Sequence, residues 1–117
     1  MSDDPEIRRS DVVVVDLDPA EGHEMKKTRP AVVVQNDVGN KNSGTTIVAP
    51  ATGTYRGYPF EVLVEAADSP FEKDSSVRLD QIRVVSIDDR IHSVLGRLDT
   101  TTMDEVDEAL KLSLALD

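Results

Sequence analysis

The runs DVVVVDL at residues 11–17 and AVVV at residues 31–34 are the most strongly patterned part of this sequence. Valine favours extended backbone because its branched side chain packs well on a pleated surface, so both runs predict strands. Each run is bounded by Asp, Pro or Gly and shows little alternation between apolar and polar residues. That pattern indicates strands that are well buried.

The connection between these strands, GHEMKKTRP at residues 22–30, is polar and partly basic. It contains His23, Lys26, Lys27 and Arg29, which a loop that only joins two strands would not need. The whole chain has a formal net charge of −10. Basic residues gathered on one connection of such an acidic chain predict a site for an anion, and phosphate is the leading candidate.

Further short strands are predicted along the chain, because β-branched residues recur between turn-forming ones. Residues 36–44 are rich in Asn, Gly and Ser and predict a turn or a single helical turn. Pro50 is expected to end the strand that precedes it. The predicted strands after residue 44 are 45–49, 60–66, 76–80, 82–87 and 91–98, of which 60–66 alternates as a half-exposed strand.

The end of the chain changes from strand to helix periodicity. Thr102 and Glu105 have the spacing of a capping box, which predicts a helix start at this point. Apolar residues then recur at helical intervals and predict a face packed on the core: Met103, Val106, Leu110 and Leu114. Acidic residues in the first turns suit the helix dipole. Five to seven strands followed by one helix indicate a mainly β fold, a small β-barrel with a C-terminal helix.

Length and composition narrow the class of protein. The chain has 117 residues, which fits one domain at 10–117 after a flexible acidic arm at 1–9. It has no cysteine, and its two histidines are far apart, so we expect neither disulfides nor a metal site. No apolar run is long enough to span a membrane, and the acidic start is unlike a signal peptide. We therefore expect a soluble, cytoplasmic protein.

The acidic charge has two interpretations. The chain has 23 acidic residues against 13 basic ones. This excess fits a well-solvated surface, and it also fits adaptation to molar salt, a halophilic habitat, where acidic, lysine-poor surfaces keep proteins soluble. At about 1 M salt the Debye length is only about 3 Å, so local charge outweighs net charge. The net charge therefore does not decide whether the partner is a nucleic acid.

Short motifs are spread over residues 8–116. These motifs are Arg9-Ser10-Asp11, Asp16-Leu17-Asp18-Pro19, Gly22-His23-Glu24, Thr28-Arg29-Pro30, Asn36-Asp37, Pro50-Ala51-Thr52, Arg56-Gly57-Tyr58-Pro59-Phe60, Asp80-Gln81-Ile82-Arg83 and Leu95-Gly96-Arg97-Leu98. In their order and spacing they resemble the MazF/PemK family of toxin endoribonucleases. The resemblance implies an SH3-like barrel that forms a homodimer and needs no cofactor. It also implies metal-independent cleavage of single-stranded RNA, as an mRNA interferase, and a cognate antitoxin as partner.

The resemblance also assigns site residues. Arg29 and Thr52 match the central catalytic pair of the family, and some PemK-type members also use residues that match His23, Arg78 and Asp80. The expected RNA-binding residues are Lys26, Lys27, Thr28, Arg56, Gln81 and Arg83.

The chemistry of RNA cleavage suggests a role for each group. Without a metal, the substrate's own 2′-hydroxyl attacks the adjacent phosphorus. Arg29 suits stabilisation of the extra negative charge, since its planar fork pairs with two phosphate oxygens and stays charged. Thr52 can donate its hydroxyl to the same phosphate. His23 and Asp80 have intrinsic pKa values better suited to proton transfer, and which is base and which is acid stays open.

Several alternatives remain open at this level. His23 also fits a solvent-exposed loop residue, Asp80 a turn cap, and Arg78 a partner for an acid on the same sheet. Two residues depart from the family pattern: Ser10 replaces a common Gly, which matters if that turn needs a positive φ, and Gly53 replaces a common Ser. Rival functions are a CcdB-like gyrase poison and a catalytically silent barrel that binds RNA or protein.

Overall fold

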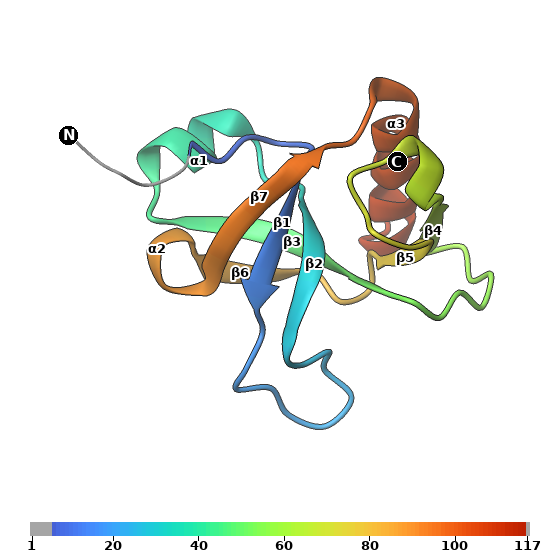
Figure 1. The fold of residues 1–117 in the computed structure, drawn as a ribbon, viewed down its shortest axis with the longest axis horizontal. Helices are drawn as coiled ribbons and strands as arrows, with labels where there is room; N and C mark the ends of the chain where they lie inside the picture. The colour runs from blue at the N-terminus through green and yellow to red at the C-terminus, as the bar shows by residue number, and fades with distance from the viewer. Residues whose placement is uncertain (1–5, 117) are drawn as a thin grey trace.

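The two valine runs lie side by side at the centre of an antiparallel sheet, as Figure 1 shows for β1 and β2. The computed structural model describes residues 6–116. Its strands are β1 (Asp11–Asp16), β2 (Thr28–Val33), β3 (Thr45–Thr52), β4 (Glu61–Val64), β5 (Ser75–Arg78), β6 (Arg83–Ser86) and β7 (Ile91–Arg97). Its helices are α1 (Asp37–Asn42), the 3-10 turn η1 (Ala66–Asp68), α2 (Ile87–Arg90) and α3 (Thr100–Ser113). The mainly β fold with a C-terminal helix is confirmed.

The strands follow the order β4-β5-β3-β2-β1-β7, and β6 pairs with β3 as well. Every pairing is antiparallel, and the described strands bend into a barrel-like sheet that is not closed into a ring. β3 is the longest strand and changes partner along its length. Residues 45–48 pair with β6, and residues 51–52 pair with β5. The segment that joins β1 to β2 extends away from the rest of the fold (Figure 1).

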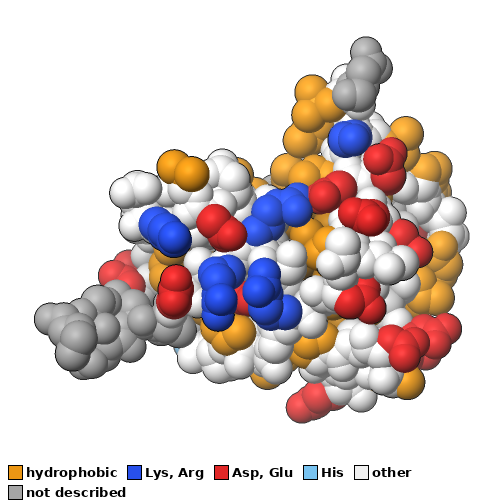
Figure 2. Space-filling view, turned by 90° about the horizontal axis from the view of Figure 1, so that it is seen from above, with side chains coloured by type: hydrophobic (Ala, Val, Ile, Leu, Met, Phe, Trp, Pro, Cys, Tyr) orange, Lys and Arg blue, Asp and Glu red, His pale blue; other side chains and the backbone are white. Residues whose placement is uncertain are grey.

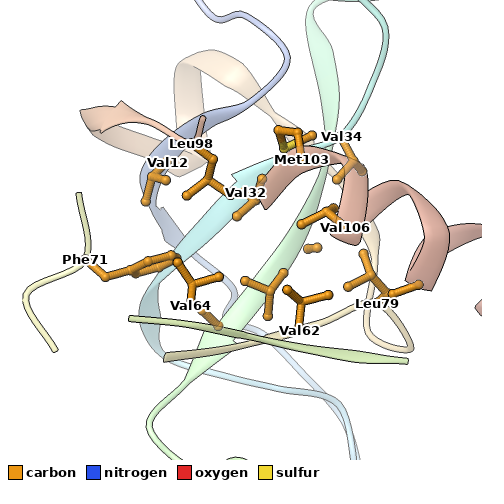
Figure 3. Packing of buried hydrophobic residues seen from close by; sticks show 14 residues of the cluster. Val12, Val32, Val34, Val62, Val64, Phe71, Leu79, Leu98, Met103 and Val106 are labelled. Carbon is orange, nitrogen blue, oxygen red and sulfur yellow. The ribbon is translucent and has the colours of Figure 1, made fainter. Parts of the chain in front are cut away.

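The central strands bury side chains on both faces, which explains why their sequences are continuously apolar. On the face that α3 covers, Val12, Val32 and Ala49 pack with Val106. Figure 3 shows Met103 and Val106 extending from α3 into this cluster. On the opposite face, a second cluster gathers the remaining buried side chains of these strands with residues of β6 and β7: Val13, Val15, Ala31, Val33, Val48, Val85 and Ile91.

The prediction that Pro50 ends its strand is wrong, because β3 continues to Thr52. Proline interrupts a strand by removing a backbone donor from the ladder. Pro50 lies between the stretch of β3 that pairs with β6, ending at Val48, and the stretch that pairs with β5, beginning at Ala51. Its missing N–H therefore falls where β3 exchanges one neighbour for the other.

Helix α3 begins before the predicted capping box. Asp99 is the N-cap, and its Oδ1 accepts the backbone N–H of Thr102 at 2.7 Å. This hydrogen bond lowers the pKa of the Asp99 carboxyl. The first turn contains no acidic residue, so the cap rather than Asp104 or Glu105 meets the helix dipole. Met103 and Val106 are buried as predicted, whereas Leu114 is exposed beyond the end of the helix. No helix in residues 6–116 is long and apolar enough to cross a membrane.

The described part of the predicted N-terminal arm is packed against the domain. Residues 1–5 lie outside the described residues. Ile7 is buried in the cluster opposite α3. Arg9 donates from Nε to the carbonyl of Val34 at 3.0 Å, and its guanidinium pairs with Asp107 of α3. One apolar side chain and one ion pair therefore attach residues 6–9, which the charged composition of this segment did not indicate.

Ser10 adopts the backbone conformation that glycine would favour. Its φ is +83°, in the left-handed region that costs a residue with a Cβ about 1–2 kcal/mol. The turn holds it there, because its N–H donates to Val33 and its carbonyl accepts from Leu98. Gly53 is different: its φ is not positive, and an added Cβ would meet no atom within 4 Å. A serine therefore fits at position 53, whereas Ser10 occupies a position suited to glycine.

The packing of α3 predicts a clear difference between two truncations on this helix. Met103 is 5% exposed, so Met103→Ala leaves a cavity and lowers the free energy of unfolding by about 2–5 kcal/mol. Leu112 on the same helix is 55% exposed, and Leu112→Ala is expected to change it by roughly 0.5 kcal/mol or less. Urea denaturation followed by circular dichroism measures both. Equal losses would contradict this packing of α3.

Candidate active site

Arg29 and Thr52 line the same hollow, at the point where β2 and β3 separate. The β2–β3 pairing ends at Ala31 opposite Pro50, although β2 stays paired with β1 as far as Thr28. In an antiparallel ladder, every second residue of a strand directs its N–H and C=O toward the same neighbour. Val34 directs its N–H to the Ile47 carbonyl of β3, so the backbone of residue 30, four positions earlier, also faces β3. Pro30 has no N–H to continue the ladder. The strands therefore part beyond it, and the Arg29–Thr52 hollow opens there.

The cations of this hollow have no carboxylate partner. Arg29 is half-buried, and its Nε donates to the backbone carbonyl of Lys26 at 2.8 Å. Lys27 and Lys73 line the same hollow, and Glu72 is the single carboxylate among the described residues that line it. Among residues 6–116, none of the three cations forms an ion pair. Unpaired cations in a concave site favour an anionic ligand, as the sequence predicted.

Three arginines elsewhere in the described residues pair with carboxylates, namely Arg9, Arg78 and Arg97. Arg97 lies 3.5 Å from the buried carboxylate of Asp11, and Arg9 pairs with Asp107. On the face seen in Figure 2, basic side chains gather next to acidic ones, and exposed hydrophobic side chains surround them. The cations of the Arg29–Thr52 hollow come from the 22–30 segment and from Lys73.

A second hollow lies next to the first and contains the predicted proton-transfer residues. It is lined by His23 and Glu24 from the loop, by Pro50 of β3, and by Asp80 from the turn between β5 and β6. Both hollows are bordered by the 22–30 loop and by residues 50–53. His23 is exposed, and within residues 6–116 its imidazole has no hydrogen-bond partner. The structure thus brings His23 and Asp80 to one hollow, and Arg29 and Thr52 to the next.

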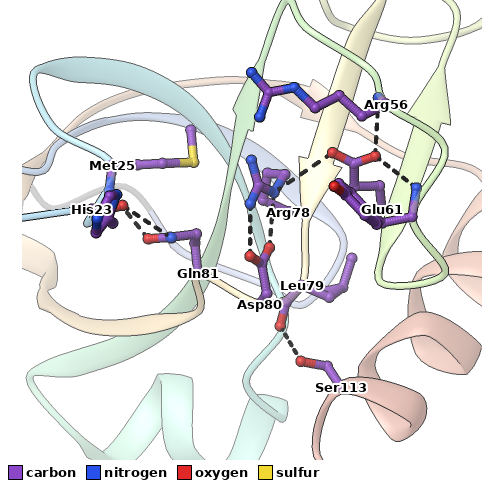
Figure 4. Close-up of polar contacts among 10 residues, drawn as sticks. His23, Met25, Arg56, Glu61, Arg78, Leu79, Asp80, Gln81 and Ser113 are labelled. Carbon is purple, nitrogen blue, oxygen red and sulfur yellow. Dashed lines mark hydrogen bonds and ion pairs between the residues drawn. The ribbon is translucent and has the colours of Figure 1, made fainter.

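Arg78 lies behind Asp80 and lines neither hollow (Figure 4). Its Nε and Nη2 donate to the two oxygens of Asp80 at 2.8 and 2.7 Å. These bonds raise the pKa of Arg78, and the charge of Glu61 adds to the effect. The guanidinium also lies 5.7 Å from the centre of the Phe60 ring. Arg78 therefore does pair with acids on its own sheet, an alternative the sequence had left open.

Two predicted RNA-binding side chains hold the loop between β1 and β2 in place. The Met25 N–H donates to Gln81 Oε1 at 3.1 Å, and Gln81 Nε2 donates to the His23 carbonyl at 3.2 Å (Figure 4). Arg83 donates from Nη1 to the Leu17 carbonyl at 2.8 Å, where β1 ends. Lys26, Lys27 and Thr28 are exposed on the loop that these contacts support.

Sequence reasoning missed four charged residues near the site. Glu72 and Lys73 line the Arg29–Thr52 hollow, Glu24 lines the second hollow, and Glu61 is buried beside Arg78. Lys73 belongs to an irregular segment with no motif, so no local signal indicates its position. Glu61 was predicted on the exposed face of an alternating strand, yet its side chain is 0% exposed. Arg56 is exposed and lines neither hollow.

A third groove, between β4 and α3, is unsuited to RNA. Its floor is apolar and includes Val62, Leu63 and Ala109, while Asp104 and Glu108 stand at its edge. It is larger than either of the other two hollows. Carboxylates at the edge repel phosphate, so size does not decide which hollow binds an anion.

Comparison with known proteins gives a family and several relatives. A sequence model described as PemK-like, MazF-like toxin of type II toxin–antitoxin system matches residues 8–114. The chain is 42% identical over 112 residues to Endoribonuclease EndoA of Bacillus subtilis, covering 94% of this chain and 96% of that protein. A crystal structure of MazF from Deinococcus radiodurans is 26% identical, with a TM-score of 0.85 over 97% of this chain and 100% of that one. An endoribonuclease from Mycobacterial species in complex with its cognate antitoxin, 24% identical, shares the fold with a TM-score of 0.80 over 95% and 97% of the chains.

The two hydrogen bonds of Gln81 predict a local effect on the loop. Gln81→Ala removes both, each contributing about 0.5–1.5 kcal/mol, so trypsin should cut after Lys26 and Lys27 roughly tenfold faster. Gln81→Glu is the matched control, because it keeps the acceptor for the Met25 N–H and loses only one bond. Limited proteolysis followed by mass spectrometry measures the rates. An alanine variant cut no faster than the wild-type protein would show that Gln81 does not hold the loop.

Proposed function

The chain belongs to the family of PemK-like, MazF-like toxins of type II toxin–antitoxin systems, and from this premise we propose that it is an endoribonuclease that cleaves single-stranded RNA, as an mRNA interferase, by attack of the substrate's own 2′-hydroxyl. The observation that carries the proposal is the pairing of Arg29, a cation without a carboxylate partner, with Thr52 in one hollow. No metal is required in this scheme, because protein side chains supply both charge stabilisation and proton transfer.

Arg29 acts on the charge that develops on phosphorus. Its Nε already donates to the Lys26 carbonyl, which fixes the side chain and leaves both terminal nitrogens to bind two oxygens of the scissile phosphate. Such preorganised donors are worth about 3–4 kcal/mol in a transition state. Thr52, across the hollow, donates its hydroxyl to the same phosphate.

Asp80 and His23 are the groups that move protons. The 2′-hydroxyl must lose a proton as its oxygen attacks phosphorus, and the 5′ oxygen must gain one as its bond to phosphorus breaks. Both side chains face the hollow next to the Arg29–Thr52 hollow, so one can act on each side of the scissile bond. His23 is unpaired and free to do either, whereas both Asp80 oxygens are occupied by Arg78.

The remaining basic residues hold the RNA backbone. Lys26 and Lys27 are exposed on the loop that borders both hollows, and we assign them to attraction of neighbouring phosphates. Thr28 and Arg56 extend this surface. Gln81 and Arg83 contribute by supporting the loop through backbone contacts. In molar salt only such local charges attract RNA, which makes the acidic net charge compatible with this function.

The natural partners follow from the family. A toxin of a type II system is neutralised by a cognate antitoxin, and we propose that this antitoxin covers the two hollows. Since its RNA substrate is mRNA, we place the enzyme in the cytoplasm. We further propose a homodimer: β7 is an edge strand that exposes Val94 and Leu95, and apolar side chains on an edge are suited to a second copy of the chain.

Cleavage products test the proposed function. The purified protein is expected to cut a long single-stranded RNA in EDTA, at low or at molar salt, and to leave a 2′,3′-cyclic phosphate and a 5′-hydroxyl. Arg29→Ala and Thr52→Ala should each lower kcat by roughly 10²–10³-fold. Mapping of cut ends and steady-state rates measure both statements.

Lys41→Ala is the matched control, because it removes an exposed cation from α1, away from both hollows. It should cut RNA like the wild-type protein. Loss of activity on chelation, or products with a 5′-phosphate, would refute attack by the 2′-hydroxyl. RNA binding without any product would instead indicate a silent barrel.

The homodimer is tested by sedimentation equilibrium. The expected mass is twice the 12.8 kDa of one chain, and Val94→Glu should shift the protein toward the monomer because it places a charge on the exposed β7 edge. Asn42→Glu, at an exposed position of α1, is the control, because it adds the same charge outside β7. A wild-type mass of one chain at micromolar concentration would refute the dimer.

A further inference from the structure

Two buried side-chain oxygens within residues 6–116 have no hydrogen-bond partner, Glu61 Oε1 and Ser76 Oγ. Both belong to residues next to Arg78. Glu61 is directly opposite Arg78 in the β4–β5 pairing, and Ser76 precedes Arg78 by two residues on β5, so the three side chains emerge on one face of the sheet. Buried polar atoms are almost always satisfied, and a pair of exceptions beside one arginine calls for an explanation.

Glu61 is only half satisfied. Its Oε2 accepts the backbone N–H groups of Arg56 and Tyr58, both at 3.1 Å, which fixes the loop before β4 (Figure 4). Its Oε1 faces Arg78 Nε at 3.8 Å, too far for a hydrogen bond. A fully buried carboxylate is strongly disfavoured unless its oxygens are bonded or paired. Oε1 of Glu61 therefore lies beyond hydrogen-bond distance of Arg78 Nε, the donor that faces it.

That donor is engaged elsewhere. The Nε of Arg78 carries one hydrogen, and it is donated to Asp80 Oδ1 at 2.8 Å. The same hydrogen cannot also serve Glu61. A displacement of about 1 Å would bring Nε into charge-assisted hydrogen-bond range of Glu61 Oε1. The Ser76 hydroxyl, also without a partner in the described residues, lies on the same face and diagonally across from Glu61.

We propose that Glu61 and Ser76 form a second binding position for the guanidinium of Arg78, to which Arg78 moves when RNA binds, so that the carboxylate of Asp80 is released for proton transfer. In the free protein, Arg78 occupies both oxygens of Asp80. In the RNA complex, Glu61 takes over the positive charge and Asp80 can accept the 2′-hydroxyl proton. Glu61 and Ser76 are thus positioning residues that act through Arg78 and Asp80. This inference rests on the proposed RNA cleavage.

Glu61→Gln is the central variant. Its amide oxygen still accepts from Arg56 and Tyr58, so the loop is retained, but the group beside Arg78 is neutral and does not compete with Asp80. We expect kcat on a short oligoribonucleotide to fall at least tenfold, with KM changed less than about threefold, because substrate binding is untouched.

A double variant separates this role from simple loss of structure. In an Asp80→Asn background, where release of Asp80 no longer matters, Glu61→Gln should cause no further loss of kcat. Ser76→Ala is a second, milder variant, and it should lower kcat in the wild-type background and leave kcat of Asp80→Asn unchanged. Asp11→Asn is the matched control: Asp11 is also buried, accepts the Arg8 N–H and lies 3.5 Å from an arginine, and its variant should keep wild-type kcat.

The outcomes are distinguishable. If the wild-type protein does not cut RNA, the proposed function fails. If it does, the inference is overturned by any of three results: wild-type kcat in Glu61→Gln, wild-type kcat in Asp80→Asn, or a loss from Glu61→Gln that is equal in both backgrounds. Should Glu61→Gln not fold, Ser76→Ala in the two backgrounds decides by the same criteria.

Discussion

The absence of a backbone N–H at Pro30 is the constraint on which the site depends. It ends the β2–β3 ladder at Ala31 opposite Pro50, while the β1–β2 ladder continues to Thr28. Arg29 is thereby held on one side by a fully paired strand and faces a hollow on the other. The hollow lies just beyond this proline, where β2 and β3 no longer pair and residues 51–52 of β3 pair with β5 instead.

Some charged side chains pair within the fold, and others face the Arg29–Thr52 hollow without an ion pair. Some of the acidic residues support the fold: Asp11, Asp107 and Glu61 each face an arginine, and Asp99 caps α3. The cations of the Arg29–Thr52 hollow have no such partner within the described residues. An acidic protein can for this reason bind a polyanion locally, because the field over a few ångströms depends on the nearest charges and not on the total.

Much of the fold and part of the site were predictable. Val12–Val15 and Ala31–Val34 were identified as buried strands because both their faces are covered, and the apolar stripe of α3 was correct as far as Leu110, which is partly buried against the core. The prediction at Pro50 was wrong because a proline destabilises a strand only where a neighbouring strand would accept its N–H. At Pro50 no neighbour does, since β3 changes there from pairing with β6 to pairing with β5, and the sequence does not show this change. Glu61 was assigned to solvent by alternation, since a sequence does not show that the loop before β4 folds its N–H groups onto that carboxylate.

The sequence by itself determined the strand and helix content, the family resemblance, and the identity of the cations that await an anion, because these depend on residue type and spacing along the chain. Tertiary structure alone decided which groups meet. It set His23 and Asp80 in one hollow and Arg29 with Thr52 in the next. It also placed Arg78 between two carboxylates at 2.7 and 3.8 Å. The physical reason is that strand register and chain reversal fix the distances between side chains across the sheet. A difference of about 1 Å in a donor–acceptor distance decides whether a hydrogen bond forms.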